Sequence, residues 1–105
     1  MLSLATCETT GLFQLVEDQD WDDVILQVEA FPDEAKVWIV SKSSKAKYRR
    51  LPLHEAFIRK APYFVIQCLL STYPEAAVEP DDGGRLPIHH AAFYGAPIEA
   101  LKALV

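Results

Sequence analysis

Apolar residues in the second half of this chain recur at the spacing of short amphipathic helices. Between residues 65 and 70 they stand at positions i, i+1, i+4 and i+5, which places them on one face of a helix. A shorter apolar set lies between residues 53 and 57. Pro52 and Pro62 open the two segments, where a helix tolerates a residue without an N–H donor, and Pro74 ends the second one. The pattern predicts a short helix followed by a longer one.

This segment is repeated thirty-five residues further along the chain. Arg50-Leu-Pro-Leu-His-Glu-Ala56 recurs as Arg85-Leu-Pro-Ile-His-His-Ala91. An alignment of residues 50–70 with 85–105 contains eight identities. A fixed period between about 20 and 50 residues is typical of a stacked solenoid, in which each unit buries its apolar face against its neighbours. We therefore predict two helices in each of two stacked units.

A weaker copy precedes these two units. Residues 12–15 align with residues 53–56 at an offset of forty-one. The copy lacks the Pro-x-His element, as a terminal unit can when one of its faces meets water. We expect an N-terminal cap repeat, with Thr9 or Thr10 as the N-cap of its first helix and Asp20 as the N-cap of its second.

Residues 81–105 carry a more specific series of motifs. They contain an Asp/Gly turn, a Leu-Pro-Ile-His tetrapeptide, Ala-Ala, a helix-ending Gly and an apolar helix. This series resembles an ankyrin repeat, and the match extends over both strong units. The chain departs from the family pattern at Leu51 and Leu86, where the family usually has Thr. Lys60 replaces the Gly between the two helices, so we expect a less relaxed corner there than at Gly95.

The resemblance implies an all-α fold, an ankyrin-type solenoid of about three repeats in one domain. Strand-forming residues from Val37 to Val40 and a Ser/Lys-rich stretch after them predict an enlarged β-finger between the first two repeats. The last repeat stops inside its second helix, so we expect that the chain continues or that a partner covers this end. Within the single domain 1–105, the expected organisation is a cap repeat at about 8–35, a finger at about 36–50, repeat 2 at about 50–80 and repeat 3 at about 81–105.

Charge is distributed unevenly along the chain. Of the 105 residues, 50% are hydrophobic and 24% are charged, which is typical of a globular domain. The net charge is −5, but residues 36–60 contain eight basic residues and one acidic residue. Nine acidic and no basic residues precede this band, and five acidic and two basic residues follow it. The band indicates either a solubility pattern with complementary fields between neighbouring repeats or a binding region on the finger.

The residue pattern does not favour an enzyme. His54 and His89 lie in the repeated turn–helix junction, where the resemblance to ankyrin implies that each ring braces the backbone of the adjacent turn. Cys7 and Cys68 stand far apart without a Cys-x-x-Cys motif, and no phosphate-binding Gly-rich loop is present. We expect no catalytic residue, no metal site and no cofactor. A membrane-spanning run and a signal-peptide pattern are both missing, so we expect a cytoplasmic or nuclear protein.

The expected function is that of a protein–protein interaction module or adaptor. Ankyrin-like arrays present their finger tips and first helices as one concave surface, and mixtures of aromatic and Arg residues are what interface hot spots favour. The alternative for Trp38 is packing onto the helices beneath it, and for Phe93 and Tyr94 it is packing against a following repeat. The expected partner-binding residues are Trp38, Lys45, Lys47, Arg49, Arg50, Ile58, Arg59, Asp82, Arg85, Phe93 and Tyr94.

Two alternative functions stay open. The basic finger, which also contains Lys42 and Tyr48, suits a phosphorylated or polyanionic partner such as a nucleic acid. The overall negative charge argues against nucleic acid and favours a protein partner with an acidic or phosphorylated segment. The other alternative is a structural spacer in a larger protein. We expect no membrane partner, and we expect the end of the last repeat to be covered by further repeats or by self-association.

Overall fold

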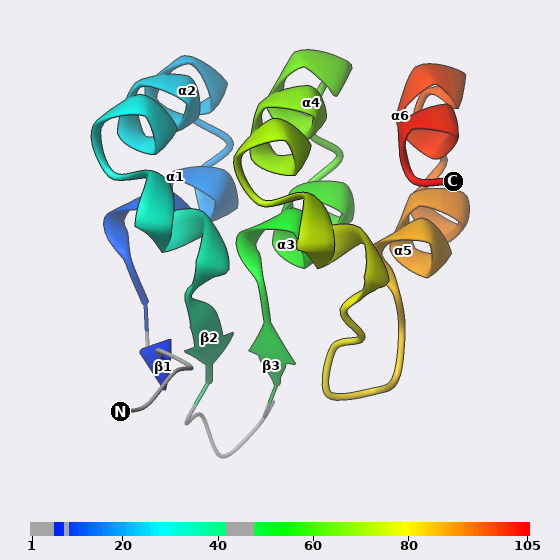
Figure 1. Ribbon diagram of the computed structural model, residues 1–105, viewed down its shortest axis with the longest axis horizontal. Helices are drawn as coiled ribbons and strands as arrows, with labels where there is room; N and C mark the ends of the chain where they lie inside the picture. Colours follow the sequence, from blue (N-terminus) through cyan, green and yellow to red (C-terminus); the bar gives the residue numbers. More distant parts are fainter. Residues whose placement is uncertain (1–5, 8, 42–47) are drawn as a thin grey trace.

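Six α-helices, arranged in three pairs, are the main elements in the described part of the chain. The computed structural model describes residues 6–7, 9–41 and 48–105. In Figure 1 the three pairs stand side by side in the order of the sequence. The all-α prediction is confirmed in its coarse form, because the described chain is mostly helical with one small sheet. The helices are α1 (Gly11–Glu17), α2 (Trp21–Ala30), α3 (Pro52–Ile58), α4 (Tyr63–Thr72), α5 (Pro87–Tyr94) and α6 (Ile98–Ala103).

The helices form two layers that share one core. The first helices of the pairs, α1, α3 and α5, pack against one another, and the second helices α2, α4 and α6 form the other layer (Figure 1). Apolar residues at helical spacing fill the space between the layers, which explains why the second helix of each pair is held in place despite its short length. Among the core residues are Leu12, Val16, Val24, Val28, Leu53, Ala56, Val65, Ile66, Leu69, Ala91 and Ala100.

The proline and capping signals in the sequence mark the helix ends. Pro52 is the first residue of α3, as expected, whereas Pro62 is the N-cap residue of α4, one position earlier than expected. Of the two predicted N-cap candidates, Thr9 and Thr10, the structure has Thr10, whose hydroxyl accepts the N–H of Phe13 at 3.1 Å. Asp20 stands at the N-cap of α2 but makes no side-chain capping bond.

A short 3-10 helix follows the second helix of the first two pairs. The first, η1, spans Pro32–Lys36, and the second, η2, spans Pro74–Val78. Each begins at a proline, which cannot donate the backbone hydrogen bond that would continue the preceding helix. The predicted end of α4 before Pro74 is therefore confirmed.

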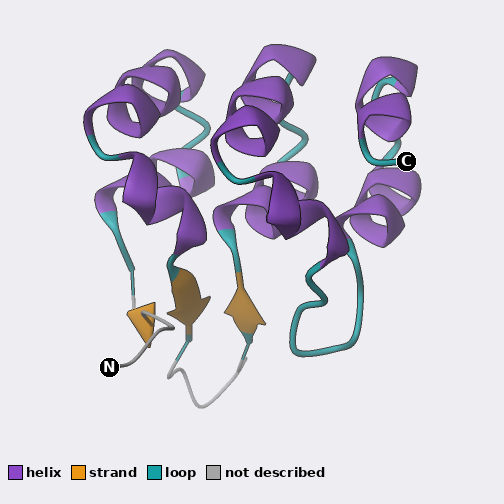
Figure 2. Cartoon of the chain, in the orientation of Figure 1, coloured by secondary structure: helices purple, strands orange, loops and turns teal. Residues whose placement is uncertain are grey.

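The strands form a small sheet on one side of the helices (Figure 2). Strand β2 (Trp38–Val40) pairs antiparallel with β3 (Arg49–Arg50), which agrees with the predicted finger. The sequence did not predict strand β1 (Thr6–Cys7), which pairs parallel with β2. The tip of the finger at 42–47 lies outside the described residues.

The corner between the two helices has the same backbone geometry in all three pairs. Gln19, Lys60 and Gly95 have φ values of 59°, 60° and 72°. In each corner the next N–H donates to the carbonyl five residues earlier, as Ala61 does to Ala56 at 2.9 Å. Only glycine adopts this left-handed region without a steric cost, so the predicted lack of relaxation at Lys60 agrees with the geometry.

We expect Lys60→Gly to raise the free energy of unfolding by about 0.5–1 kcal/mol. Removing the Cβ relieves the steric strain of the left-handed conformation, about 1–2 kcal/mol. The larger conformational entropy of glycine in the unfolded chain offsets part of this gain. Urea denaturation followed by circular dichroism measures the difference. Gly95→Ala is the reverse control and should be destabilising through the backbone alone, because no atom lies within 4 Å of an added Cβ. A lower midpoint for Lys60→Gly would contradict this account.

Candidate functional site

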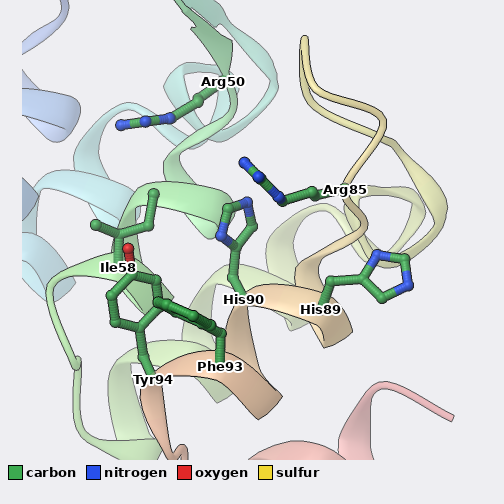
Figure 3. A pocket seen from close by; sticks show the side chains of 7 residues that line it. All are labelled: Arg50, Ile58, Arg85, His89, His90, Phe93 and Tyr94. Atoms are coloured by element: carbon green, nitrogen blue, oxygen red, sulfur yellow. The ribbon is translucent and has the colours of Figure 1, made fainter.

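A pocket of about 450 Å³ lies where α3 and α5 pack side by side, next to the end of β3. Its lining combines two guanidinium groups and two imidazole rings with apolar and aromatic side chains. We call it the α3–α5 pocket. Its lining residues are Arg50, Ile58, Arg85, His89, His90, Phe93 and Tyr94 (Figure 3).

Arg50, at the end of β3, is held in place by two neighbours, Glu55 and Tyr48. Its Nη1 donates to Oε1 of Glu55 at 2.8 Å, and its guanidinium lies over the Tyr48 ring at 4.1 Å. Glu55 is only 1% exposed, and its second oxygen accepts the Nε–H of Arg59 at 2.7 Å. Arg50 and Arg59 thus share one buried carboxylate, which reduces the positive charge that Arg50 presents to the pocket.

Arg85 differs from Arg50 because its guanidinium makes no hydrogen bond or ion pair with the described part of the chain. Its backbone, by contrast, is fixed: the N–H donates to Asp81 Oδ1 at 2.9 Å, and the carbonyl accepts the N–H of Asp81 at 2.9 Å. The loop therefore positions the base of an exposed side chain whose charge is available to a ligand.

His90 is the buried polar residue of the pocket. Its Nε2 lies 2.8 Å from Asp81 Oδ2, and both side chains are almost fully buried. Burial raises the pKa of Asp81, but hydrogen bonds from the N–H groups of Arg85 and Gly83 and from His90 outweigh this effect, so the pKa lies below its ordinary value. The ring of His90 also stacks on Tyr94 with centroids 6.4 Å apart. Asp81 thus fixes the orientation of the imidazole in the pocket wall.

The other end of the pocket is apolar. In Figure 3, Ile58, Phe93 and Tyr94 lie together below the two arginines, with Ile58 nearest to Arg50, while the ring of His89 points away from these three side chains. Phe93 is 81% exposed and meets Tyr94 edge to face, with ring centroids 4.9 Å apart. A large, exposed aromatic ring that is held by a neighbouring ring is a suitable anchor for a partner.

The structure brings together some of the residues that the sequence predicted for the site and separates others. Arg50, Ile58, Arg85, Phe93 and Tyr94 all line the pocket. Arg59 and Asp82 do not: Arg59 is bound to Glu55, and the backbone N–H of Asp82 donates to the carbonyl of Arg49. Lys45 and Lys47 lie outside the described residues.

The prediction that Trp38 contacts a partner is wrong. Its side chain is only 3% exposed, and it packs in the core with its ring 5.9 Å from that of His54. The guanidinium of Arg49 lies over the Trp38 ring at 3.9 Å, so Arg49 covers an aromatic ring that was predicted to be exposed. The alternative, packing of Trp38 onto the underlying helices, is the one observed, because an indole buries a large apolar area there.

His89 and His90 line the pocket but were not among the residues predicted for the site. A signal for His90 exists, because it aligns with Glu55, thirty-five residues earlier. Glu55 and His90 are both buried beside the pocket. Glu55 binds Arg50, and His90 binds Asp81. A polar residue directly after the repeated histidine therefore marks this position in each unit.

His54, in contrast, has a structural role. Its Nδ1 accepts the N–H of Leu51 at 3.0 Å, so Nε2 carries the proton that is donated to the carbonyl of Glu79 at 2.8 Å. The ring is fully buried, and burial lowers its pKa from 6.5 to about 4. A neutral imidazole thus connects the start of α3 to the segment after η2, as expected for a ring that braces turn backbone.

No metal or membrane feature stands out in residues 6–7, 9–41 and 48–105. This part of the chain contains no cluster of three or more His, Cys, Asp and Glu side chains that is suited to hold a metal ion. None of its helices combines the length and the apolar character that crossing a membrane requires. The chain matches no protein family model, no curated protein and no solved structure. Its function is therefore inferred from the geometry of its own residues.

Proposed function

We propose that this protein is an ankyrin-type array of helical pairs that recognises another protein on the face with the α3–α5 pocket. The repeated architecture supports the proposal, because three helical pairs share one corner geometry and two share the Leu-Pro-x-His junction. A 3-10 helix follows the second helix in each of the first two pairs, and the finger strands lie between these two pairs. Stacked units of this kind offer an extended surface rather than a deep catalytic cleft.

The observation that carries the proposal is the exposure of Phe93 beside two arginines. A monomer gains nothing from leaving 81% of a phenylalanine in water, whereas a partner that covers the ring recovers its hydrophobic free energy. Aromatic and Arg side chains around a shallow pocket are also the composition of interface hot spots. A simple structural spacer would need neither feature.

The described residues give less support to nucleic-acid binding. Bases need open aromatic faces to stack on, but in the finger Arg49 covers Trp38 and Arg50 covers Tyr48. Arg50 is also paired with Glu55, which lowers its attraction for phosphates. The net charge of −5 adds a general repulsion of polyanions.

We expect Phe93→Ala to weaken binding of the partner by about 1–4 kcal/mol, mainly through faster dissociation, because it removes an anchor. The partner is captured from the source cells with the immobilised chain and identified, and binding kinetics are then measured for purified proteins. Phe64→Ala is the matched control, because Phe64 is 48% exposed on α4 and does not line the pocket. Equal dissociation rates for Phe93→Ala and the wild type would rule out this binding surface.

A further inference from the structure

We infer that the α3–α5 pocket takes the carboxylate side chain of an acidic residue in an extended segment of the partner protein, together with an apolar side chain next to it. The inference rests on the proposed function and specifies the chemistry of the partner. It follows from the division of the pocket into a cationic end with Arg50 and Arg85 and an apolar end with Ile58, Phe93 and Tyr94. A ligand that fills both ends needs a negative group and an apolar group within one short stretch of chain.

The cationic end is prepared for a planar anion. Arg50 is oriented by Glu55 and Tyr48, so it loses little side-chain entropy when it donates to a ligand. Arg85 is exposed, and its guanidinium is free to form the two parallel hydrogen bonds that a carboxylate accepts.

The charge at this end fits a monoanion better than a dianion. The charged groups next to it besides Arg85 are Arg50, Glu55 and Asp81. Arg50 and Arg59 both bind the buried carboxylate of Glu55, Arg59 Nη2 also lies 3.8 Å from Glu17 Oε2, and Asp81 faces His90. Asp81 and Glu55 are already satisfied by hydrogen bonds, but their negative charges still oppose a second anion. Arg85 is thus the cation whose charge the described residues do not neutralise, and one carboxylate balances it. A phosphate, at about −1.5 to −2 near neutral pH, would leave excess negative charge.

The apolar end of the pocket determines which kind of side chain the partner carries next to its acidic residue. Phe93 and Tyr94 meet edge to face and offer an aromatic corner, and Ile58 closes it from α3. In an extended segment, side chains up to two residues apart reach neighbouring subsites. We therefore expect an aromatic or aliphatic residue within two positions of the Asp or Glu.

The test uses random heptapeptides displayed on phage and selected on the whole chain. Wild type should enrich peptides with Asp or Glu within two positions of an apolar residue. A selected peptide is then synthesised in three forms, with Glu, Gln or phosphoserine at the acidic position, and dissociation constants are measured by titration. We expect the Gln form to bind at least tenfold more weakly than the Glu form, and the phosphoserine form to bind no more tightly than the Glu form.

Two variants connect the selectivity to the pocket. Arg85→Gln should weaken binding of the Glu peptide at least tenfold, because it removes the guanidinium that the carboxylate binds, and should change the affinity for the Gln peptide by no more than about twofold. The four dissociation constants form a double-mutant cycle that isolates the carboxylate–guanidinium interaction. Lys102→Gln, which removes the same charge from α6 outside the pocket, should leave both peptides within about twofold. Arg85 and Lys102 are both exposed, so neither substitution should unfold the chain.

Several results would overturn the inference. Selection of peptides without an acidic residue would overturn it, and so would phosphoserine binding more than tenfold tighter than Glu, or equal effects of the Arg85 and Lys102 variants. If the selected peptides lack an acidic residue but lose binding to Phe93→Ala, the proposed function stands and only the carboxylate is wrong. If no peptide is enriched over a Phe93→Ala, Arg85→Gln double variant, both proposals fail.

Discussion

The free energy of unfolding should fall by about 3 kcal/mol as the pH is lowered from 7 to 4, because of His54 alone. Burial lowers the pKa of this residue in the folded state from 6.5 to about 4, although the Glu79 carbonyl and the Asp81 carboxylate favour the protonated ring. The unfolded chain therefore binds a proton as the pH falls through 6.5, whereas the folded chain does so only near 4. Stability is fully present above this window and is lost within it, at about 1.36 kcal/mol per pKa unit.

Urea denaturation at several pH values between 7 and 4 measures this loss. His54→Gln is the control, because an amide offers both an acceptor and a donor but does not titrate in this range. Between pH 7 and pH 4, the free energy of unfolding of this variant should fall by about 3 kcal/mol less than that of the wild type. Asp81 does not obscure the comparison, because its lowered pKa gives stability that is lost only below its ordinary value of 3.8. Parallel curves for the two proteins would show that His54 is not the cause.

His54→Ala should reduce the free energy of unfolding at pH 7 by about 3 kcal/mol, whereas His89→Ala should cost about 1 kcal/mol or less. Removing the buried ring leaves the N–H of Leu51 and the carbonyl of Glu79 without their partner and opens a cavity. His89 makes the equivalent bond to the N–H of Leu86 at 2.9 Å, but its ring is exposed, so water can replace it.

The same urea titrations at pH 7 compare the two variants directly. His54→Gln is again informative, because it should recover part of the loss if the two hydrogen bonds account for it. Equal midpoints for His54→Ala and His89→Ala would contradict the difference between a buried and an exposed junction. The sequence alone predicted equal effects, since both histidines stand in the same motif.

Local features of the fold could be predicted from the sequence because they depend on residues close together in the chain. Pro52 and Pro74 lack a backbone donor, so they can begin a helix but cannot continue the one before. The histidine three residues after Leu51 reaches back to its N–H because the turn places it there, and the same holds for Leu86. The apolar spacing of residues 65–70 likewise predicted the buried face of α4.

The site was predictable only in part, because the repeat aligns equivalent positions but does not show how they pack. Arg50, Ile58, Arg85, Phe93 and Tyr94 were assigned from their place in the motif, and the tertiary structure places all of them around one pocket. The pattern could not show that Arg50 would be paired, because its partner Glu55 has no acidic equivalent in the next unit, where His90 stands.

The sequence by itself determined that this protein consists of paired helices with a repeated junction, because helix ends and apolar faces follow from neighbouring residues. The tertiary structure decided which polar and aromatic groups remain accessible. Trp38 is buried beneath Arg49, while Phe93 is exposed, although both are large aromatic residues in predicted surface elements. The reason is physical: burial depends on which other elements pack against a side chain, and strand β1, helix α3 and helix α5 come from distant parts of the chain.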